Sequence, residues 1–167
     1  HRDLHSFPTR RSSDLEWSVS NSDGRGFIIA CRHIGVEPGG SILRIRGGGS
    51  TARSIAYSWS KEGGQIIPVR GRRALAGGPW DVSIVDDSLK ADLSVNLDVE
   101  AGGGGSFPLP AGRQVSISYD EDWKIDDFAV IMVAAQHLEA WKKFFSPNKI
   151  EKLPSLIELL ELLEERR

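Results

Sequence analysis

The longest apolar segment of the chain runs from Phe128 to Ala135, eight residues without a polar side chain. A helix at a protein surface has an apolar stripe and a polar face, so a helix that is apolar on all sides has to be enclosed. Asp126 and Asp127 precede the segment, where negative charge favours a helix N-terminus, and Pro147 ends it. The pattern predicts an enclosed helix over about residues 124–145.

Short apolar segments separated by Gly, Asn and Asp occupy most of the chain before this helix. Their alternation of apolar and polar positions predicts strands at 17–20, 26–34, 42–46, 53–60, 65–69, 80–85, 89–99 and 113–119. Turns every 8–12 residues favour an antiparallel meander. Gly47–Thr51 has the composition of a phosphate-binding loop, but it lacks a lysine and precedes a predicted strand. We therefore interpret it as a turn.

The predicted fold is mainly β with C-terminal helices. It is an antiparallel β-barrel or curved meander that encloses the helix of about 124–145 and is followed by a short amphipathic helix. Three regions follow: 1–15, 16–145 with the barrel, and 146–167 with a linker and a Leu/Glu-rich helix. Ser6–Leu15 matches the translation of a widely used sequencing adapter, so residues 1–15 are predicted to be disordered read-through. The chain begins with His, and we expect it to be a fragment.

Two segments share the form Trp-x-Val followed by a turn, namely Trp17-Ser18-Val19 with Asp23-Gly24 and Trp80-Asp81-Val82 with Asp86-Asp87. The last predicted strand, Val115–Tyr119, leads into the apolar helix. This arrangement resembles the Tubby C-terminal-like superfamily, which includes the LURP-one-related proteins and the phospholipid scramblases. The resemblance covers roughly residues 16–145 and implies a barrel around a hydrophobic helix and binding of phosphoinositides. Fewer strands are predicted than a full barrel has, and the terminal helix lies outside the family pattern.

Charge and cysteine content narrow the range of functions. With 21 Lys+Arg against 23 Asp+Glu, the formal net charge of −2 is not that of a bulk nucleic-acid binder. No apolar run approaches the roughly 18–20 residues of a membrane span. One cysteine, Cys31, excludes an internal disulfide framework and a cysteine-based zinc site. We expect a cytoplasmic protein, with peripheral membrane association as an option.

The best binding candidate is the basic loop Arg70-Gly71-Arg72-Arg73, because closely spaced guanidinium groups bind phosphate in a bidentate manner. Arg44 and Arg46 would join Arg70, Arg72 and Arg73 only if they lie nearby. A phospholipid headgroup is the ligand that the resemblance implies. A solvated loop without a ligand is the alternative interpretation.

The remaining chemistry-bearing residues favour structural roles. His33 and His137 are more simply structural residues than a shared site, and Cys31 lies in an apolar segment that suits an inert core residue. The acidic cluster over 120–127 is explained by helix capping better than by calcium binding. No nucleophile–base pair is apparent, so we expect no catalytic residue, metal or cofactor.

We therefore predict a non-enzymatic binding domain for phospholipid or phosphoinositide headgroups. The alternative is a β-rich structural or protein-interaction module that self-associates through residues 154–167, or binds another protein there. The leucine stripe of that helix would form the interface, and it consists of Leu156, Leu159, Leu160 and Leu163.

Overall fold

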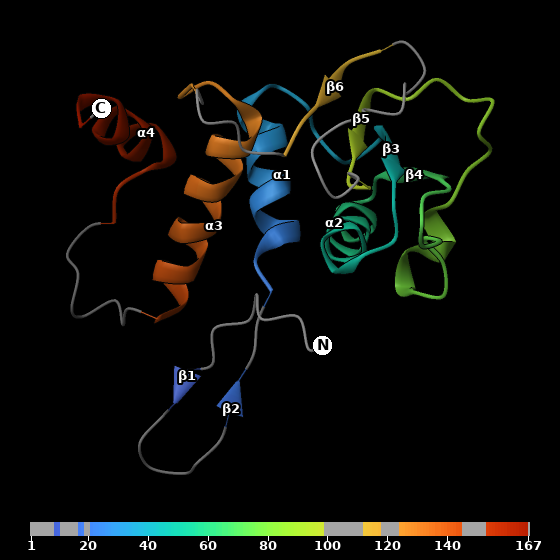
Figure 1. Ribbon diagram of the computed structural model, residues 1–167, viewed down its shortest axis with the longest axis horizontal. Coiled ribbons are helices and arrows are strands. Elements are labelled where there is room, and N and C mark those ends of the chain that lie inside the picture. The colour runs from blue at the N-terminus through green and yellow to red at the C-terminus, as the bar shows by residue number, and fades with distance from the viewer. Residues whose placement is uncertain are drawn as a thin grey trace.

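The computed structural model describes residues 9–10, 17–18, 21–98, 112–117, 124–144 and 153–166. Its strands are β1 (Thr9–Arg10), β2 (Trp17–Ser18), β3 (Ile42–Arg46), β4 (Gln65–Val69), β5 (Leu93–Asn96) and β6 (Gln114–Val115). Its helices are α1 (Asp23–His33), α2 (Ser50–Lys61), the 3-10 helix η1 (Pro79–Ser83), α3 (Phe128–Phe144) and α4 (Leu156–Glu165). Figure 1 labels these elements.

The main sheet is parallel. Its strands stand in the order β4-β3-β5-β6, and β3 pairs in parallel with both β4 and β5. Helix α2 makes the crossover between β3 and β4, as parallel strands require. The strands β1 and β2 form a separate antiparallel pair.

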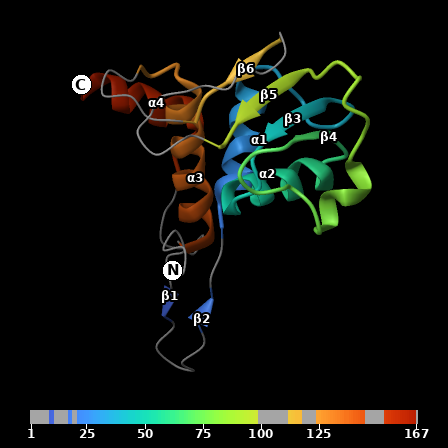
Figure 2. The ribbon, with the colours of Figure 1, turned by 45° about the vertical axis from the view of Figure 1, so that its right-hand side comes forward.

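The helices stand in a row beside the sheet. Helix α2 contacts β3 and β4, α1 packs against α2, α3 packs against α1, and α4 packs against α3. Figures 1 and 2 show this succession from the sheet outward to the C-terminal helix. Because α1 has a helix on each side, it is the central element of the helical layer.

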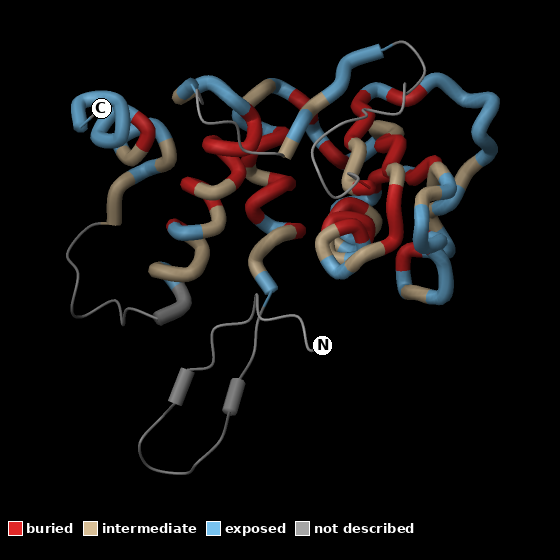
Figure 3. Tube along the Cα trace, in the orientation of Figure 1, coloured by how far each residue is buried: buried red, intermediate tan, exposed pale blue. Residues whose placement is uncertain are grey.

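The aromatic ring of Phe27 joins three helices in the core. It lies on α1 and meets Trp59 of α2 and Phe128 of α3, with ring centroids 6.2 Å and 5.3 Å away in edge-to-face geometry. Such pairs add to the stability that burial of the rings provides. Figure 3 shows the buried residues concentrated on α1, α2, α3 and the facing strands. This core fixes how α1 sits between its neighbours.

The parallel sheet contradicts the predicted antiparallel barrel or meander. The wrong assignment began at two segments that were predicted as strands and are helices. Segment 26–34 belongs to α1, which buries residues on two sides, so no single apolar stripe marks it as a helix. Segment 53–60 belongs to α2. Its buried residues follow a helical spacing, and they are Ala52, Ile55, Ala56 and Trp59.

Other expectations are confirmed or corrected locally. Strands at 42–46 and 65–69 are confirmed, and so are helices within 124–145 and near the C-terminus. The predicted strand 80–85 is instead largely the 3-10 helix η1, and within the described parts of the predicted strands 89–99 and 113–119, which end at residues 98 and 117, the structure has the short β5 and β6. Helix α3 is covered by α1 and α4 and is not wrapped by a barrel. No helix in the described ranges is long and apolar enough to cross a bilayer.

Gly24 sits where α1 comes closest to α2. Its N–H donates to Ser54 Oγ at 3.0 Å, and a Cβ at this position would lie 2.8 Å from the carbonyl carbon of Ser54. A side chain here would therefore push the two helices apart.

We expect Gly24→Ala to lower the free energy of unfolding by about 1–3 kcal/mol, the usual cost of overpacking. In an unobstructed helix the same change would add about 1 kcal/mol. Urea unfolding would measure the difference. Arg25→Ala, at the adjacent exposed position, is the matched control and should change stability by less than about 1 kcal/mol. A stabilised Gly24→Ala protein would contradict the close approach.

Candidate functional site

The loop between β3 and α2 contains two glycines with different roles. Gly47 has φ +105°, and a Cβ there would lie 3.3 Å from the carbonyl carbon of Leu97, so the turn requires glycine. Gly49 is the N-cap of α2, and a Cβ there would meet no atom within 4 Å. Ala52 follows and is fully buried. A Gly47-x-Gly49-x-x-Ala52 spacing between a parallel strand and a helix is that of dinucleotide-binding loops.

A cavity of about 220 Å³ opens at this loop. Its lining comes from the loop and α2, the end of β5, and the segment after β6, and consists of Gly49, Ser50, Thr51, Ala52, Asn96, Leu97 and Ile117. Since β4 and β5 lie on opposite sides of β3, the cavity stands where the strand order reverses. Ligands of open α/β sheets bind at this point, and the N-terminus of α2 favours a phosphate there.

The basic segment 70–73 follows β4 at the same edge of the sheet. Arg72 Nε donates to Asp98 Oδ1 at 2.8 Å, and Arg72 N donates to Asp98 Oδ2 at 2.7 Å. The Arg72 hydrogen bonds, with weaker help from the charge of Arg46, hold the pKa of Asp98 below its ordinary value of 3.8. Because Asp98 follows β5, this ion pair passes over the end of β3 and lies beside Gly47.

The structure separates the arginines that the sequence singled out. Arg70, Arg72 and Arg73 are exposed in the loop after β4. Arg44 is buried, and its Nη2 donates to two backbone carbonyls of the segment 87–89, at 3.4 Å and 3.2 Å. Arg44 is therefore engaged within the fold, Arg72 is paired with Asp98, and Arg70 and Arg73 lie at the surface of the loop.

A second polar group lies at the start of α1. Gln136 Nε2 on α3 donates to Asp23 Oδ1 at 3.1 Å, and Thr51 Oγ1 on α2 donates to Asp23 Oδ2 at 2.9 Å. Both oxygens of one carboxylate are thus held by helices on opposite sides of α1. All three side chains are half-buried. Because Thr51 also lines the cavity, it links the Asp23 carboxylate to the glycine loop through one hydrogen bond.

An oriented carboxylate can accept a proton. A carboxylate has about four acceptor positions, so two donors leave room for a hydroxyl of a bound molecule. The site thus combines a place for a dinucleotide with a general acid–base, which are the two requirements for oxidising an alcohol. In the described ranges no group of three or more His, Cys, Asp or Glu residues could hold a metal.

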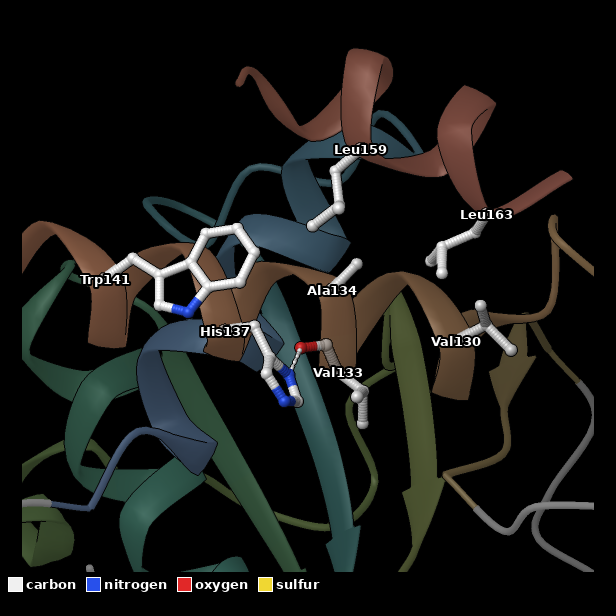
Figure 4. A pocket seen from close by; sticks show the side chains of 7 residues that line it. All are labelled: Val130, Val133, Ala134, His137, Trp141, Leu159 and Leu163. Atoms are coloured by element: carbon white, nitrogen blue, oxygen red, sulfur yellow. Dashed lines mark hydrogen bonds between the residues drawn. The ribbon is translucent and has the colours of Figure 1, made fainter. Parts of the chain in front are cut away.

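An apolar groove of about 380 Å³ lies between α3 and α4 (Figure 4). Its lining consists of Val130, Val133, Ala134, His137, Trp141, Leu159 and Leu163. His137 Nδ1 lies 2.8 Å from the backbone oxygen of Val133 in the same helix, and Figure 4 shows this hydrogen bond as a dashed line. The groove is a packing feature of the two helices, and it is separate from the carboxyl edge of the sheet.

The leucine stripe of the terminal helix faces this groove from α4. Leu160 is buried, Leu156 and Leu159 pack against the core, and Leu163 is 38% exposed. Ser155 and Glu158 form a capping box that starts the helix. The stripe therefore docks on α3 within the chain, and self-association through residues 154–167 stays a prediction.

Sequence reasoning missed Asp23, Thr51, Gln136 and Asp98. One signal was present, because Gly47-x-Gly49-x-x-Ala52 follows a strand and opens a segment with helical spacing. Interpreting 53–60 as a strand removed the helix that gives this motif its meaning. The contact between Asp23 and Gln136 joins residues 113 positions apart, and no local pattern announces it.

Comparison with known proteins agrees with this architecture. No family model matches the chain. The shikimate dehydrogenase (NADP(+)) of Rubrobacter xylanophilus is 31% identical over 106 residues, which are 53% of this chain and 37% of that protein. The chain thus spans little more than a third of that relative.

Two solved structures show the same fold. The shikimate 5-dehydrogenase of Listeria monocytogenes, in complex with shikimate and NAD, has a TM-score of 0.60 at 14% identity, over 90% of this chain and 65% of that one. The 5-ketofructose reductase of a Gluconobacter strain has a TM-score of 0.60 at 16% identity, over 96% and 68%. The fold is that of the shikimate dehydrogenases.

These likenesses correct the predictions made from the sequence. The resemblance to the Tubby C-terminal-like superfamily is wrong, because proteins similar in sequence and in structure have a parallel α/β fold. The prediction of a non-enzymatic domain that binds phospholipid headgroups is contradicted as well, since these proteins are dehydrogenases and a reductase.

The Arg72–Asp98 ion pair makes stability depend on pH in a known direction. The folded-state pKa of Asp98 lies below 3.8, so the unfolded chain binds more protons in the interval between the two values. The stabilisation is complete above this interval and is lost as the pH falls through the folded-state value. We expect wild type to be more stable than Asp98→Asn near neutral pH, with a difference that shrinks below about pH 4.

Urea unfolding at several pH values would measure this difference. Asp126→Asn removes an exposed carboxylate and serves as the control for net charge. A wild-type advantage that stays constant or grows towards acid would contradict the pairing of Asp98 with Arg72.

Proposed function

We propose that this chain is the cofactor-binding part of an NADP-dependent oxidoreductase of the shikimate dehydrogenase kind. One observation carries the proposal. The cavity at the glycine loop of β3 is joined through Thr51 to the carboxylate of Asp23. A dinucleotide site and an acid–base group therefore stand side by side in the fold of known dehydrogenases.

The residues at the loop fit a dinucleotide. Gly47 permits the tight turn, and the open space at Gly49 lets a pyrophosphate approach the backbone. Dinucleotide sites that select NAD carry an acidic residue about 20 positions on, which binds the ribose hydroxyl. Here Arg70 occupies that region, and no Asp or Glu lies between Glu62 and Asp81. Arginine at this place favours the 2′-phosphate of NADP.

When bound, the nicotinamide ring would accept or supply the hydride. The protein residues handle the proton. In the oxidation of an alcohol, the carbon loses a hydride and the hydroxyl loses a proton, so a ketone, the reduced cofactor and one proton are the products. Asp23 accepts that proton in oxidation and returns it in reduction. Gln136 and Thr51 hold its two oxygens in place.

The substrate class follows from the solved relatives, whose substrates are named as shikimate and 5-ketofructose. Both are polyhydroxylated, so we propose a polyhydroxylated alcohol or ketone, with shikimate the first compound to test. The cytoplasmic location predicted from the sequence belongs to this proposal. Association with a membrane surface does not, because it rested on the contradicted headgroup binding.

Gly49→Val should weaken cofactor binding without unfolding the protein. Its backbone angles suit any residue, and a Cβ there meets nothing within 4 Å, so the side chain fits and fills the phosphate position. We expect wild type to bind NADPH and Gly49→Val to bind it at least about tenfold more weakly. Calorimetry and NADPH fluorescence would measure both affinities, with thermal unfolding as the check on folding.

Ala76→Val places the same valine side chain at an exposed position outside the cavity, and this variant should bind NADPH as wild type does. Replacing Arg70, Arg72 and Arg73 together by Ala should weaken NADPH binding far more than NADH binding. Equal NADPH affinity in wild type and Gly49→Val would contradict the assignment of this loop.

Asp23→Asn should remove turnover and leave cofactor binding intact. The amide keeps the size of the carboxylate but cannot take the proton, and general base catalysis contributes about 10²–10⁴-fold to rate. In the oxidoreductase that contains this chain, we expect kcat for shikimate oxidation with NADP⁺ to fall within that range, with less than about a twofold change in NADPH affinity. Full activity in Asp23→Asn would exclude Asp23 as the acid–base.

A further inference from the structure

Thr51 belongs to both halves of the site. Its position lines the cavity beside the glycine loop, and its hydroxyl donates to Asp23 Oδ2 at 2.9 Å. Threonine in the first turn of a helix commonly serves the backbone through its hydroxyl. Here the N-cap of α2 is Gly49, without a side-chain cap bond, and the Thr51 hydroxyl is directed across to α1.

The backbone around Asp23 is held independently of Thr51. Ser54, one turn further along α2, accepts a hydrogen bond from Gly24 N at 3.0 Å and donates to Asn21 Oδ1 at 3.1 Å. Asp23 N also donates to Asn21 Oδ1, at 2.8 Å. These bonds place the start of α1 against α2. The hydrogen bond from the Thr51 hydroxyl is therefore not needed to hold the backbone, and its effect is to orient the Asp23 carboxylate.

Two donors from different helices define the rotation of that carboxylate. Gln136 holds Oδ1 from α3, and Thr51 holds Oδ2 from α2. With one donor removed, the group can turn about its Cβ–Cγ bond while keeping the other contact. A reacting carboxylate needs a fixed direction, because small misplacements of a catalytic group are costly in rate.

We propose that Thr51 is a positioning residue for Asp23. It orients the carboxylate for proton transfer and transmits cofactor binding at the first turn of α2 to the acid–base group. The inference rests on the proposed function, in which the same turn holds the phosphates of the dinucleotide. If cofactor binding moves this turn, the hydrogen bond from Thr51 Oγ1 to Asp23 Oδ2 moves the carboxylate with it.

The test compares Thr51→Val with Thr51→Ser. Valine keeps the shape of threonine and removes the donor, while serine keeps the donor and loses a methyl group. We expect kcat of Thr51→Val to fall about tenfold or more, as for loss of a hydrogen bond to a charged group, and Thr51→Ser to recover most of it. Because Thr51 also lines the cavity, the Kd for NADPH is measured for both variants, and the fall in kcat of Thr51→Val should exceed any change in its Kd.

Ser60→Ala is the matched control, because it removes a hydroxyl from the far end of α2. Ser60 Oγ and Ser83 Oγ lie 2.6 Å apart, so this control also breaks a side-chain hydrogen bond. Its kcat should equal that of wild type. Wild-type kcat in Thr51→Val, or an equal loss in Thr51→Val and Thr51→Ser, would overturn the positioning role.

A readout without turnover separates this inference from the proposed function. In protein carrying ¹³C-labelled aspartate, the carboxyl signal of Asp23 is identified by its loss in Asp23→Asn. We expect this signal to move in Thr51→Val and to return in Thr51→Ser, before any ligand is added. NADPH should then move it in wild type and not in Thr51→Val.

An unchanged Asp23 signal in Thr51→Val would overturn the inference. The proposed function is judged separately, by whether wild type binds NADPH at all. If NADPH does not bind, the proposed function fails, and with it the transmission of cofactor binding, whereas the comparison of the ligand-free variants still decides whether Thr51 orients Asp23.

Discussion

The close contact of α1 with a helix on each side sets the geometry of the whole molecule. Gly24 lies against the backbone of Ser54 on α2, and Gly26 lies against Gln136 and the backbone of Met132 on α3. Glycine at both places removes the side chains that would hold the helices apart. Phe27, the next residue, fills the space between α2 and α3 with its ring. Residues 24–27 therefore allow the three helices to come close together and also hold them there through the packing of Phe27.

The close approach of the helices brings together polar side chains from three of them, namely Asp23 of α1, Thr51 of α2 and Gln136 of α3. Asp23 immediately precedes Gly24, so the spacing that lets the helices touch also places its carboxylate between α2 and α3. The parallel sheet supplies the other half of the site, since the loop after β3 ends at the N-terminus of α2. Because α2 contacts both the sheet and α1, the position of the Asp23 carboxylate is set by the same helix that begins at the glycine loop after β3.

The sequence predicts those elements of the fold whose pattern of apolar and polar residues has a single interpretation. Strands 42–46 and 65–69 and the apolar helix were predictable, because an apolar run bounded by glycines, or one too long for a strand, has few interpretations. Helix α1 was not, because a helix buried on two sides lacks the stripe that identifies it. In α2 the alternation of Ile55, Tyr57 and Trp59 suggested a strand, although Tyr57 is 47% exposed. The site depends on both helices, so it was lost with them.

The carboxylate beside the basic loop has a consequence for how a ligand is recognised. Arg72 already has an anionic partner in Asp98, and a phosphate that binds to it exchanges one anion for another. The net gain at Arg72 is then small, and an uncharged ribose hydroxyl gains nothing by displacing the carboxylate. Any anion that binds Arg72 therefore has to compete with Asp98, and because the Asp98 side chain is largely buried, salt weakens this ion pair less than it weakens a fully exposed one.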